Sequence, residues 1–371
     1  MPPVSMLIKP ASSSCNMRCR YCFYADVASH REVRNAGIMN EQTHENMVRR
    51  AMEYAEGSVS FAFQGGEPTL AGLDFFRRHM SFCKKYAKTG VQIHNSLQTN
   101  GYAVDEEWAK FFAENHFLIG LSLDGPKEIH DLFRRDAQGQ GTFNRIRQTV
   151  TLLNRHKVEY NILCVVTEEV AKNANKVMNF FINNGFTYLQ FIPCLDGLEG
   201  EKGEWSLSAK RYGEFLVTSF NKFYSCFLKK KFLSVRNFDN YLSLLAGYPA
   251  ENCGMNGRCA AYFVVEGNGD VYPCDFYVLD QYKGGNVNDN SLREIRNSEV
   301  FEKFVEESFP VSKECKECKW YMLCRGGCRR YREPFENGIP SLNFYCESYK
   351  KFFEECGEGL LSITKEILKK A

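Results

Sequence analysis

Long apolar runs are missing from this 371-residue chain. No stretch of about 18 apolar residues is present that could cross a membrane. The opening residues, MPPVSMLIKP, contain neither a basic leader nor an apolar segment of signal-peptide length. An excess of positive charge is also missing: 47 Lys and Arg are balanced by 45 Asp and Glu, so no broad basic field attracts nucleic acid. We therefore expect a cytoplasmic protein that has neither a membrane nor a nucleic acid as its partner.

Cysteine is too sparse for a small disulfide scaffold. The chain has 16 cysteines in 371 residues, about 4%, which is below the roughly 8 to 10% of such scaffolds. With 44% hydrophobic and 25% charged residues, the composition is that of a globular protein and excludes a disordered chain or a coiled coil. The length allows one or two domains. In a reducing cytoplasm, these cysteines favour metal binding.

The first 230 or so residues alternate short apolar runs with longer segments of helical periodicity. Strands are expected at 5–9, 58–64, 91–97, 117–123, 158–166 and 187–193, and a long helix at 209–231. Strands separated by helices run parallel, with right-handed crossovers, and carry their functional groups at their carboxyl ends. This predicts an α/β fold whose site is formed by the loops that follow the strands.

Unusual loops follow the first four expected strands: CNMRCRYC, QGGEP, QTNG and DGP, in that order. Near residue 235 the composition changes to Cys, Gly and aromatic residues with short turns such as GNGD. We therefore expect two domains, a βα domain at 1–235 and a cysteine-rich domain at 236–371.

The first loop contains Cys15, Cys19 and Cys22 in the spacing C-x3-C-x2-C. A structural zinc site normally has four protein ligands, and no histidine lies in or beside this loop. Three thiolates leave one corner of a [4Fe-4S] cluster open, so that the fourth iron can bind a small molecule. The spacing therefore favours a cluster with an open iron over zinc.

A second group contains eight cysteines, enough for two fully ligated clusters. They are Cys253, Cys259, Cys274, Cys315, Cys318, Cys324, Cys328 and Cys346. Zinc ribbons are the alternative, but C-x2-C occurs once in this group and no histidine lies among these cysteines. The remaining five cysteines are expected to be buried or incidental thiols.

Together these motifs resemble the radical S-adenosylmethionine (AdoMet) enzymes. Tyr21 precedes the last cysteine of the first loop, as in that family, and Gly65-Gly66-Glu67-Pro68 is similar to its GGE motif. The second group of cysteines resembles the SPASM domain, which holds two auxiliary [4Fe-4S] clusters. The resemblance implies an α/β fold: a partial (β/α)6 TIM-like barrel at 1–235 and a C-terminal SPASM domain with a final helix at 236–371. It also implies AdoMet and three [4Fe-4S] clusters as cofactors.

The SPASM resemblance divides the second group of cysteines into two sets of cluster ligands. One auxiliary cluster would be held by Cys253, Cys259, Cys274 and Cys328. The other would be held by Cys315, Cys318, Cys324 and Cys346.

Longer stretches resemble one family of these enzymes, the anaerobic sulfatase-maturating enzymes, which convert a cysteine or serine of a sulfatase to Cα-formylglycine. Among them are SFAFQGGEPTLAGL, GLSLDGPKEIH and VYPCDFYVLD. The resemblance implies that a radical takes a hydrogen atom from Cβ of the target and that Asp275 is the catalytic base. It assigns Tyr24 and Gln64 to the substrate. It assigns AdoMet to Tyr21, Gly66, Ser122, Arg134 and Leu195, and the sequence alone does not separate Arg134 from its neighbour Arg135.

The resemblance also implies the partners. The substrate would be an unfolded or nascent sulfatase segment with Cys or Ser followed by x-Pro or Ala-x-Arg, and the reductant an external low-potential donor such as flavodoxin or ferredoxin. An alternative is another SPASM enzyme that forms a thioether or carbon–carbon link in a ribosomal peptide, although no extra peptide-recognition domain is evident before Cys15. A non-catalytic iron–sulfur carrier is a further alternative, but it leaves the open three-cysteine site and GGEP unexplained.

Overall fold

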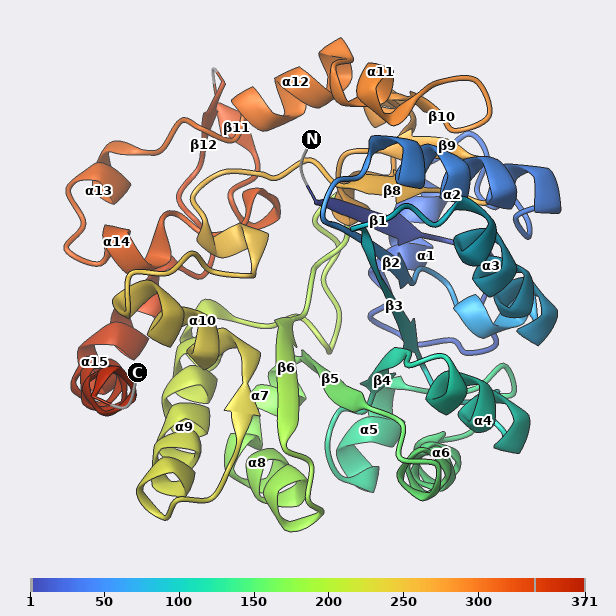
Figure 1. Cartoon of the computed structure of the whole chain (residues 1–371). Coiled ribbons are helices and arrows are strands. Elements are labelled where there is room, and N and C mark those ends of the chain that lie inside the picture. Colours follow the sequence, from blue (N-terminus) through green and yellow to red (C-terminus); the bar gives the residue numbers. More distant parts are fainter. Residues whose placement is uncertain (1–2, 337, 370–371) are drawn as a thin grey trace.

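The computed structural model of the chain describes residues 3–336 and 338–369, and Figure 1 shows their arrangement. Six parallel strands pair in sequence order at the centre of a curved sheet. They are β1 (Val4–Ile8), β2 (Ser58–Phe63), β3 (Gln92–Thr99), β4 (Leu118–Ser122), β5 (Tyr160–Val166) and β6 (Tyr188–Pro193). All six predicted strands are confirmed, and no strand end differs from its prediction by more than two residues.

Helices follow these strands and cover the outer face of the sheet (Figure 1). They are α1 (Phe23–Ser29), α2 (Glu41–Tyr54), α3 (Leu73–Tyr86), α4 (Glu106–Glu114), α5 (Lys127–Phe133), α6 (Phe143–Arg155), α7 (Glu168–Lys172), α8 (Ala174–Asn183), α9 (Ala209–Leu228) and the 3-10 helix η1 (Pro68–Ala71). The predicted helix at 209–231 is α9, which ends slightly earlier. In the described part of the chain, no helix is long and apolar enough to span a membrane.

Large buried residues alternate with small ones along β2, which explains why this sheet has a packed outer face and space on its inner face. Phe61 and Phe63 are buried, and the ring of Phe63 packs edge-on against Phe76 of α3 at 5.0 Å between centres. Ser60 and Ala62 point to the opposite face, because successive strand residues alternate. Their small side chains leave room inside the curve of the sheet, where the site lies.

The sheet of the barrel continues beyond the six strands at both edges, and three strands of the cysteine-rich region extend it. The two-residue strand β7 (Ser234–Val235) pairs with β6 at one edge, and at the other edge β8 (Phe263–Val265) pairs in parallel with β1. Strands β9 (Asp270–Tyr272) and β10 (Gly285–Asn286) follow β8 in antiparallel pairing. The resulting strand order is open, as expected of a partial barrel. The pairing of β8 with β1 was not predicted, and the domain boundary at residue 235 stays a prediction.

The remaining helices and strands surround the cysteines of the second group. They are α10 (Arg236–Leu245), α11 (Leu292–Arg296), α12 (Glu299–Glu306), α13 (Lys313–Lys316), α14 (Tyr321–Cys324), α15 (Cys346–Leu368), the 3-10 helices η2 (Cys253–Met255), η3 (Asp275–Tyr277), η4 (Asp280–Tyr282) and η5 (Arg329–Tyr331), and the hairpin strands β11 (Phe335–Glu336) and β12 (Ile339–Pro340). The C-terminal helix α15 packs along α9, where the rings of Phe352 and Phe220 lie 5.7 Å apart. This contact packs α15 against the barrel.

Candidate active site

Three predicted cluster ligands lie in the loop between β1 and α1. The pKa of Cys19 is raised to about 12, chiefly by burial; Arg134 lowers it, and Cys22 and Cys15 raise it. The three thiols are therefore close enough to affect one another. The loop is held to the segment after α5 by a backbone hydrogen bond from Arg18 to Arg135. The structure thus brings Cys15, Cys19 and Cys22 together at the carboxyl ends of the strands.

A cavity adjoins these three thiols and contains every residue that the sequence analysis assigned to AdoMet. Its wall comes from the loops after β1, β2, β3 and β6, from the carboxyl ends of β3 to β6, and from Arg134 at the end of α5. The predicted lining residues are Tyr21, Gly66, Ser122, Arg134 and Leu195, together with Cys15, Cys19 and Cys22. The neighbouring Gly65, Thr99 and Asn100 complete this side of the cavity.

Arg134, and not Arg135, reaches this cavity. Arg134 is buried and forms an ion pair with Asp124, at 2.8 Å between Nε and Oδ2. The Tyr21 hydroxyl donates a hydrogen bond to the same carboxylate oxygen. Arg135 is exposed and donates to the carbonyl oxygen of Gly139. Asp124 therefore orients two predicted cofactor residues. It belongs to the DGP loop that the sequence analysis noted, although it was not predicted as a site residue.

The GGEP loop lies against the cysteine loop. Gly66 has φ +44°, and a Cβ at this position would overlap the carbonyl oxygen of Ser14, so the close approach of the two backbones requires glycine. Glu67 is buried and accepts hydrogen bonds from the backbone N–H of Asn100 (2.8 Å) and the Thr99 hydroxyl (2.7 Å). Its carboxylate therefore joins the loops that follow β2 and β3.

A second cavity contains the predicted base and both predicted substrate residues. Tyr24, Gln64 and Asp275 line it, beside Cys253 and Cys328. Oδ2 of Asp275 accepts a hydrogen bond from the Tyr24 hydroxyl at 2.7 Å and another from the Gln64 side-chain amide at 2.9 Å. The three predicted residues thus form one contact group. The two cavities adjoin, because Phe23, Tyr24, Gln98, Ile192, Pro193 and Phe276 line both.

Lys9 was missed by the sequence analysis. It is the first residue after β1, and its Nζ atom lies 3.1 Å from Oδ1 of Asp275. The same atom lies 4.4 Å from the centre of the Tyr24 ring. A charged residue at the end of an apolar strand, in MLIKP, is the signal that could have identified it, because strand ends meet at the site.

In the second group of cysteines, the members of each predicted set lie near one another. Burial raises the pKa of Cys274 well above its ordinary value, and the neighbouring thiols Cys328, Cys253 and Cys259 contribute. The other set lines one small hollow, with Cys315, Cys318, Cys324 and Cys346 in its wall. The five other cysteines are all buried, as expected: Cys83, Cys164, Cys194, Cys226 and Cys356.

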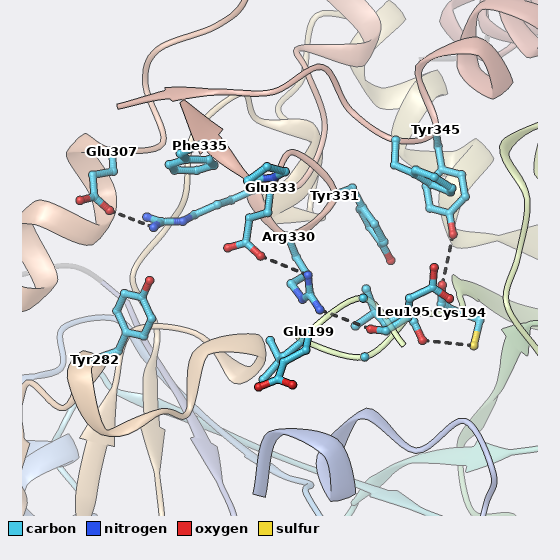
Figure 2. Close-up of a pocket in the computed structure, with 17 residues that line it drawn as sticks. Cys194, Leu195, Glu199, Tyr282, Glu307, Arg330, Tyr331, Glu333, Phe335 and Tyr345 are labelled. Atoms are coloured by element: carbon cyan, nitrogen blue, oxygen red, sulfur yellow. Dashed lines mark hydrogen bonds and ion pairs between the residues drawn. The ribbon is translucent and has the colours of Figure 1, made fainter. Parts of the chain in front are cut away.

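A wider pocket of about 730 Å³ lies where the loop after β6 faces the cysteine-rich region (Figure 2). Two contacts of that region fix this loop: the Tyr345 hydroxyl donates to the carbonyl oxygen of Cys194 at 3.1 Å, and Arg330 donates to that of Asp196 at 3.3 Å. Cys194 and Leu195 line both this pocket and the cavity beside the three thiols. The cysteine-rich region therefore supports one wall of the predicted AdoMet cavity.

The donor sets suit iron–sulfur clusters. No group of three or more His, Cys, Asp or Glu within residues 3–336 and 338–369 is arranged to hold one metal ion. Three thiols beside an open cavity fit a [4Fe-4S] cluster with a free iron, and two sets of four thiols fit fully ligated clusters. The assignment of individual ligands stays a prediction.

Two family models match the chain. The radical SAM superfamily matches residues 10–181, and an iron–sulfur cluster-binding domain matches residues 253–319. The second match ends before Cys324, Cys328 and Cys346. With the fold and the two adjoining cavities, these matches define the chain as a radical AdoMet protein with an iron–sulfur cluster-binding region.

Full-length relatives narrow the family. The chain is 49% identical to the cysteine-type anaerobic sulfatase-maturating enzyme of Clostridium perfringens, covering 99% of this chain and 100% of the relative. It is 32% identical to the serine-type enzyme of Bacteroides thetaiotaomicron, covering 99% and 92%. A solved structure described as native anSMEcpe with bound AdoMet and Cp18Cys peptide matches with a TM-score of 0.94 at 48% identity, covering 99% and 100%. The chain belongs to the anaerobic sulfatase-maturating enzymes.

Proposed function

We propose that the protein oxidises a cysteine of a sulfatase polypeptide to Cα-formylglycine. The observation that supports this proposal best is the shared wall of the two cavities, which sets the predicted AdoMet residues beside Asp275. A cysteine substrate is favoured over serine because identity is 49% to a cysteine-type relative and 32% to a serine-type relative. A cytoplasmic location stays a prediction.

The residues of the first cavity are suited to hold AdoMet against the three-thiol loop. Arg134 offers a guanidinium for a carboxylate, and its orientation is fixed by Asp124. The backbone of Gly66 is open to close approach because no side chain covers it. When bound, AdoMet and the first cluster supply hydrogen-atom abstraction from the substrate Cβ, and the auxiliary clusters supply an electron acceptor.

Asp275 is proposed to accept the proton that the substrate loses. The target –CH2–SH group loses one hydrogen atom, one proton and one electron, and becomes a thioaldehyde. Water then converts this group to the aldehyde and hydrogen sulfide. Tyr24 and Gln64 hold the Asp275 carboxylate toward the cavity that both adjoin. Cys274, a predicted ligand of an auxiliary cluster, immediately precedes Asp275 in the chain, so proton and electron leave the substrate in the same part of the cavity.

The alternative of a different SPASM enzyme, one that crosslinks a ribosomal peptide, has weaker support. A structure of that broader fold, Streptococcus suis SuiB with its precursor peptide SuiA, matches with a TM-score of 0.66 at 16% identity, a likeness that extends to the fold alone. The full-length relatives at 48 to 49% identity favour sulfatase maturation.

Anaerobic incubation with AdoMet, a low-potential reductant and a peptide containing Cys-x-Pro-x-Arg tests the proposal. Mass spectrometry should show formylglycine at the cysteine, with 5′-deoxyadenosine formed in parallel. Matched peptides with serine or alanine at the target position serve as controls: the serine peptide should react more slowly, and the alanine peptide should yield no aldehyde. A crosslinked peptide, or no change in the cysteine peptide despite AdoMet cleavage, would contradict the proposal.

A further inference from the structure

Lys9 contacts Asp275 but lines neither of the two cavities. Its side chain is 5% exposed, and it is absent from the described residues that line the AdoMet cavity and the Asp275 cavity. Of the described carboxylates, only that of Asp275 forms an ion pair with it. A buried ammonium group is costly unless a counter-charge compensates it. The pair therefore joins the end of β1 to the start of η3 across the site.

Three side chains contact the Asp275 carboxylate. Tyr24 and Gln64 donate to Oδ2, whereas Lys9 approaches Oδ1 at 3.1 Å as an ion pair whose angles are outside hydrogen-bond geometry. Because Lys9 is the one charged group of the three and contacts the other oxygen, it holds the side of the carboxylate that the two neutral donors leave free. Without it, the carboxylate would be fixed through Oδ2 alone.

Gly65 provides the space for the Lys9 side chain. A Cβ at Gly65 would lie 2.7 Å from Cγ and 2.9 Å from Cδ of Lys9, closer than packed atoms approach. The next glycine, Gly66, instead approaches the backbone of the cysteine loop. The two glycines of GGEP thus have different neighbours: Gly66 contacts the cluster loop, and Gly65 contacts the lysine that holds Asp275.

We infer that Lys9, seated against Gly65, is a positioning residue for the base Asp275. This inference rests on the proposed function. Lys9 touches neither substrate nor AdoMet, and it acts by fixing the Asp275 carboxylate where the substrate proton is released. A base displaced by about 1 Å can cost on the order of 100-fold in rate. Loss of Lys9 should therefore slow aldehyde formation while leaving AdoMet cleavage and peptide binding in place.

The test compares Lys9→Met with Lys9→Arg and with the exposed-lysine control Lys172→Met in anaerobic assays of the cluster-loaded enzyme. For Lys9→Met, kcat for aldehyde should fall about 10- to 100-fold, as expected for a misplaced group. The peptide KM should stay within about threefold, and the ratio of 5′-deoxyadenosine to aldehyde should rise with the loss, because uniform binding is retained. Lys9→Arg keeps the charge and should recover most of the coupling, and Lys172→Met should match the wild type.

Two results would overturn the positioning role. One is a Lys9→Met enzyme with normal kcat and normal coupling. The other is a raised peptide KM with unchanged kcat, which would make Lys9 a substrate contact. Peptide affinity measured by fluorescence anisotropy without turnover should be unchanged, and iron content confirms loading. If the wild type itself forms no aldehyde, the proposed function fails. If the wild type forms aldehyde and Lys9→Met does so with normal kcat and a normal ratio of 5′-deoxyadenosine to aldehyde, only the role of Lys9 fails.

A double-mutant cycle tests the part of Gly65. Gly65→Ala should uncouple the wild type strongly. In the Lys9→Ala background, where Cγ and Cδ are absent, Gly65→Ala should reduce the coupling much less. The effects of two substitutions are not additive when the two residues act through one contact. Equal costs in both backgrounds would show that Gly65 acts independently of Lys9.

Discussion

The Tyr24 hydroxyl lies 2.7 Å from Oδ2 of Asp275, although 250 residues separate the two positions and they belong to different predicted domains. Tyr24 follows the last cysteine of the first loop, and Asp275 follows a cysteine of the second group. Their contact therefore joins the loop predicted to bind AdoMet to the region predicted to hold an auxiliary cluster. Substrate bound between them would be near both.

Asp275→Asn should separate the two halves of the reaction. Asparagine keeps the size of the side chain and one acceptor oxygen for Tyr24 and Gln64, but it has no basicity and no charge to pair with Lys9, so 5′-deoxyadenosine should still form while aldehyde falls. Loss of a general base commonly costs about 10²- to 10⁴-fold. Both products are measured in one anaerobic assay, with iron content as the control. Near-normal aldehyde from a fully loaded variant would refute the role of Asp275, and a parallel loss of 5′-deoxyadenosine would indicate damage at Cys274.

Iron content tests the ligand assignment. Three clusters of four irons predict about twelve irons and twelve sulfides per chain after anaerobic reconstitution. Joint replacement of Cys15, Cys19 and Cys22 by alanine should leave about eight irons and abolish AdoMet cleavage. Zinc in place of iron in a folded sample, or cleavage that persists in the triple variant, would contradict the assignment.

Arg134 and Arg135 form a matched pair for testing AdoMet binding. Arg134→Lys keeps the charge but loses the forked geometry and part of the Asp124 contact, so AdoMet should bind about tenfold more weakly or worse. Arg135→Lys changes an exposed side chain and should stay within about twofold. Equilibrium binding of AdoMet to the loaded enzymes gives the comparison. Equal effects at both positions would show that the buried guanidinium has no special part.

The buried histidine His79 predicts loss of stability in acid. His79 is buried between His44 and Asn95, and burial lowers its pKa to about 4, with the Asn95 hydrogen bond opposing the shift. An unfolded histidine titrates near 6.5, so between pH 6.5 and about 4 the unfolded chain binds a proton that the folded chain does not. The contribution of His79 to the free energy of unfolding is therefore fully present above pH 6.5. Between pH 6.5 and about 4 it falls by up to about 1.4 kcal/mol per pH unit.

Thermal midpoints of the loaded enzyme at pH 7.5 and 5.5 measure this effect. The wild type should lose more stability between these values than His79→Gln, whose side chain does not titrate. Exposed His116 replaced by glutamine is the control and should keep the wild-type pH dependence. An equal loss in wild type and His79→Gln would place the acid sensitivity elsewhere.

Local patterns predicted the six strands and the positions of the loops. Alternating burial and helical spacing are local properties, so strand ends such as those of β2 and β6 were found within two residues. Cysteine spacing identified both groups of thiols. Through resemblance we assigned Tyr21, Gly66, Ser122, Arg134 and Leu195. They line one cavity because Tyr21, Gly66, Ser122 and Leu195 lie at or after the carboxyl ends of strands of the same parallel sheet, and Arg134 reaches the same edge from the end of α5.

Contacts between distant parts of the chain were not predictable in this way. Lys9 lies next to Asp275, Tyr345 contacts the carbonyl of Cys194, and β8 pairs with β1, yet no local pattern links these positions. Asp124 shows an intermediate case: its loop was noted, but its partners Tyr21 and Arg134 became visible only when three loops met. Such contacts depend on the three-dimensional path of the chain.

An isotope-transfer measurement tests the central claim most directly. The enzyme, AdoMet and reductant are incubated anaerobically with a Cys-x-Pro-x-Arg peptide whose target cysteine carries two deuterium atoms on Cβ. The account predicts that 5′-deoxyadenosine gains one deuterium and that the peptide becomes an aldehyde retaining the other, both detected by mass spectrometry. Unlabelled 5′-deoxyadenosine formed alongside the aldehyde, or label transferred only from a peptide deuterated at Cα, would contradict hydrogen abstraction from Cβ.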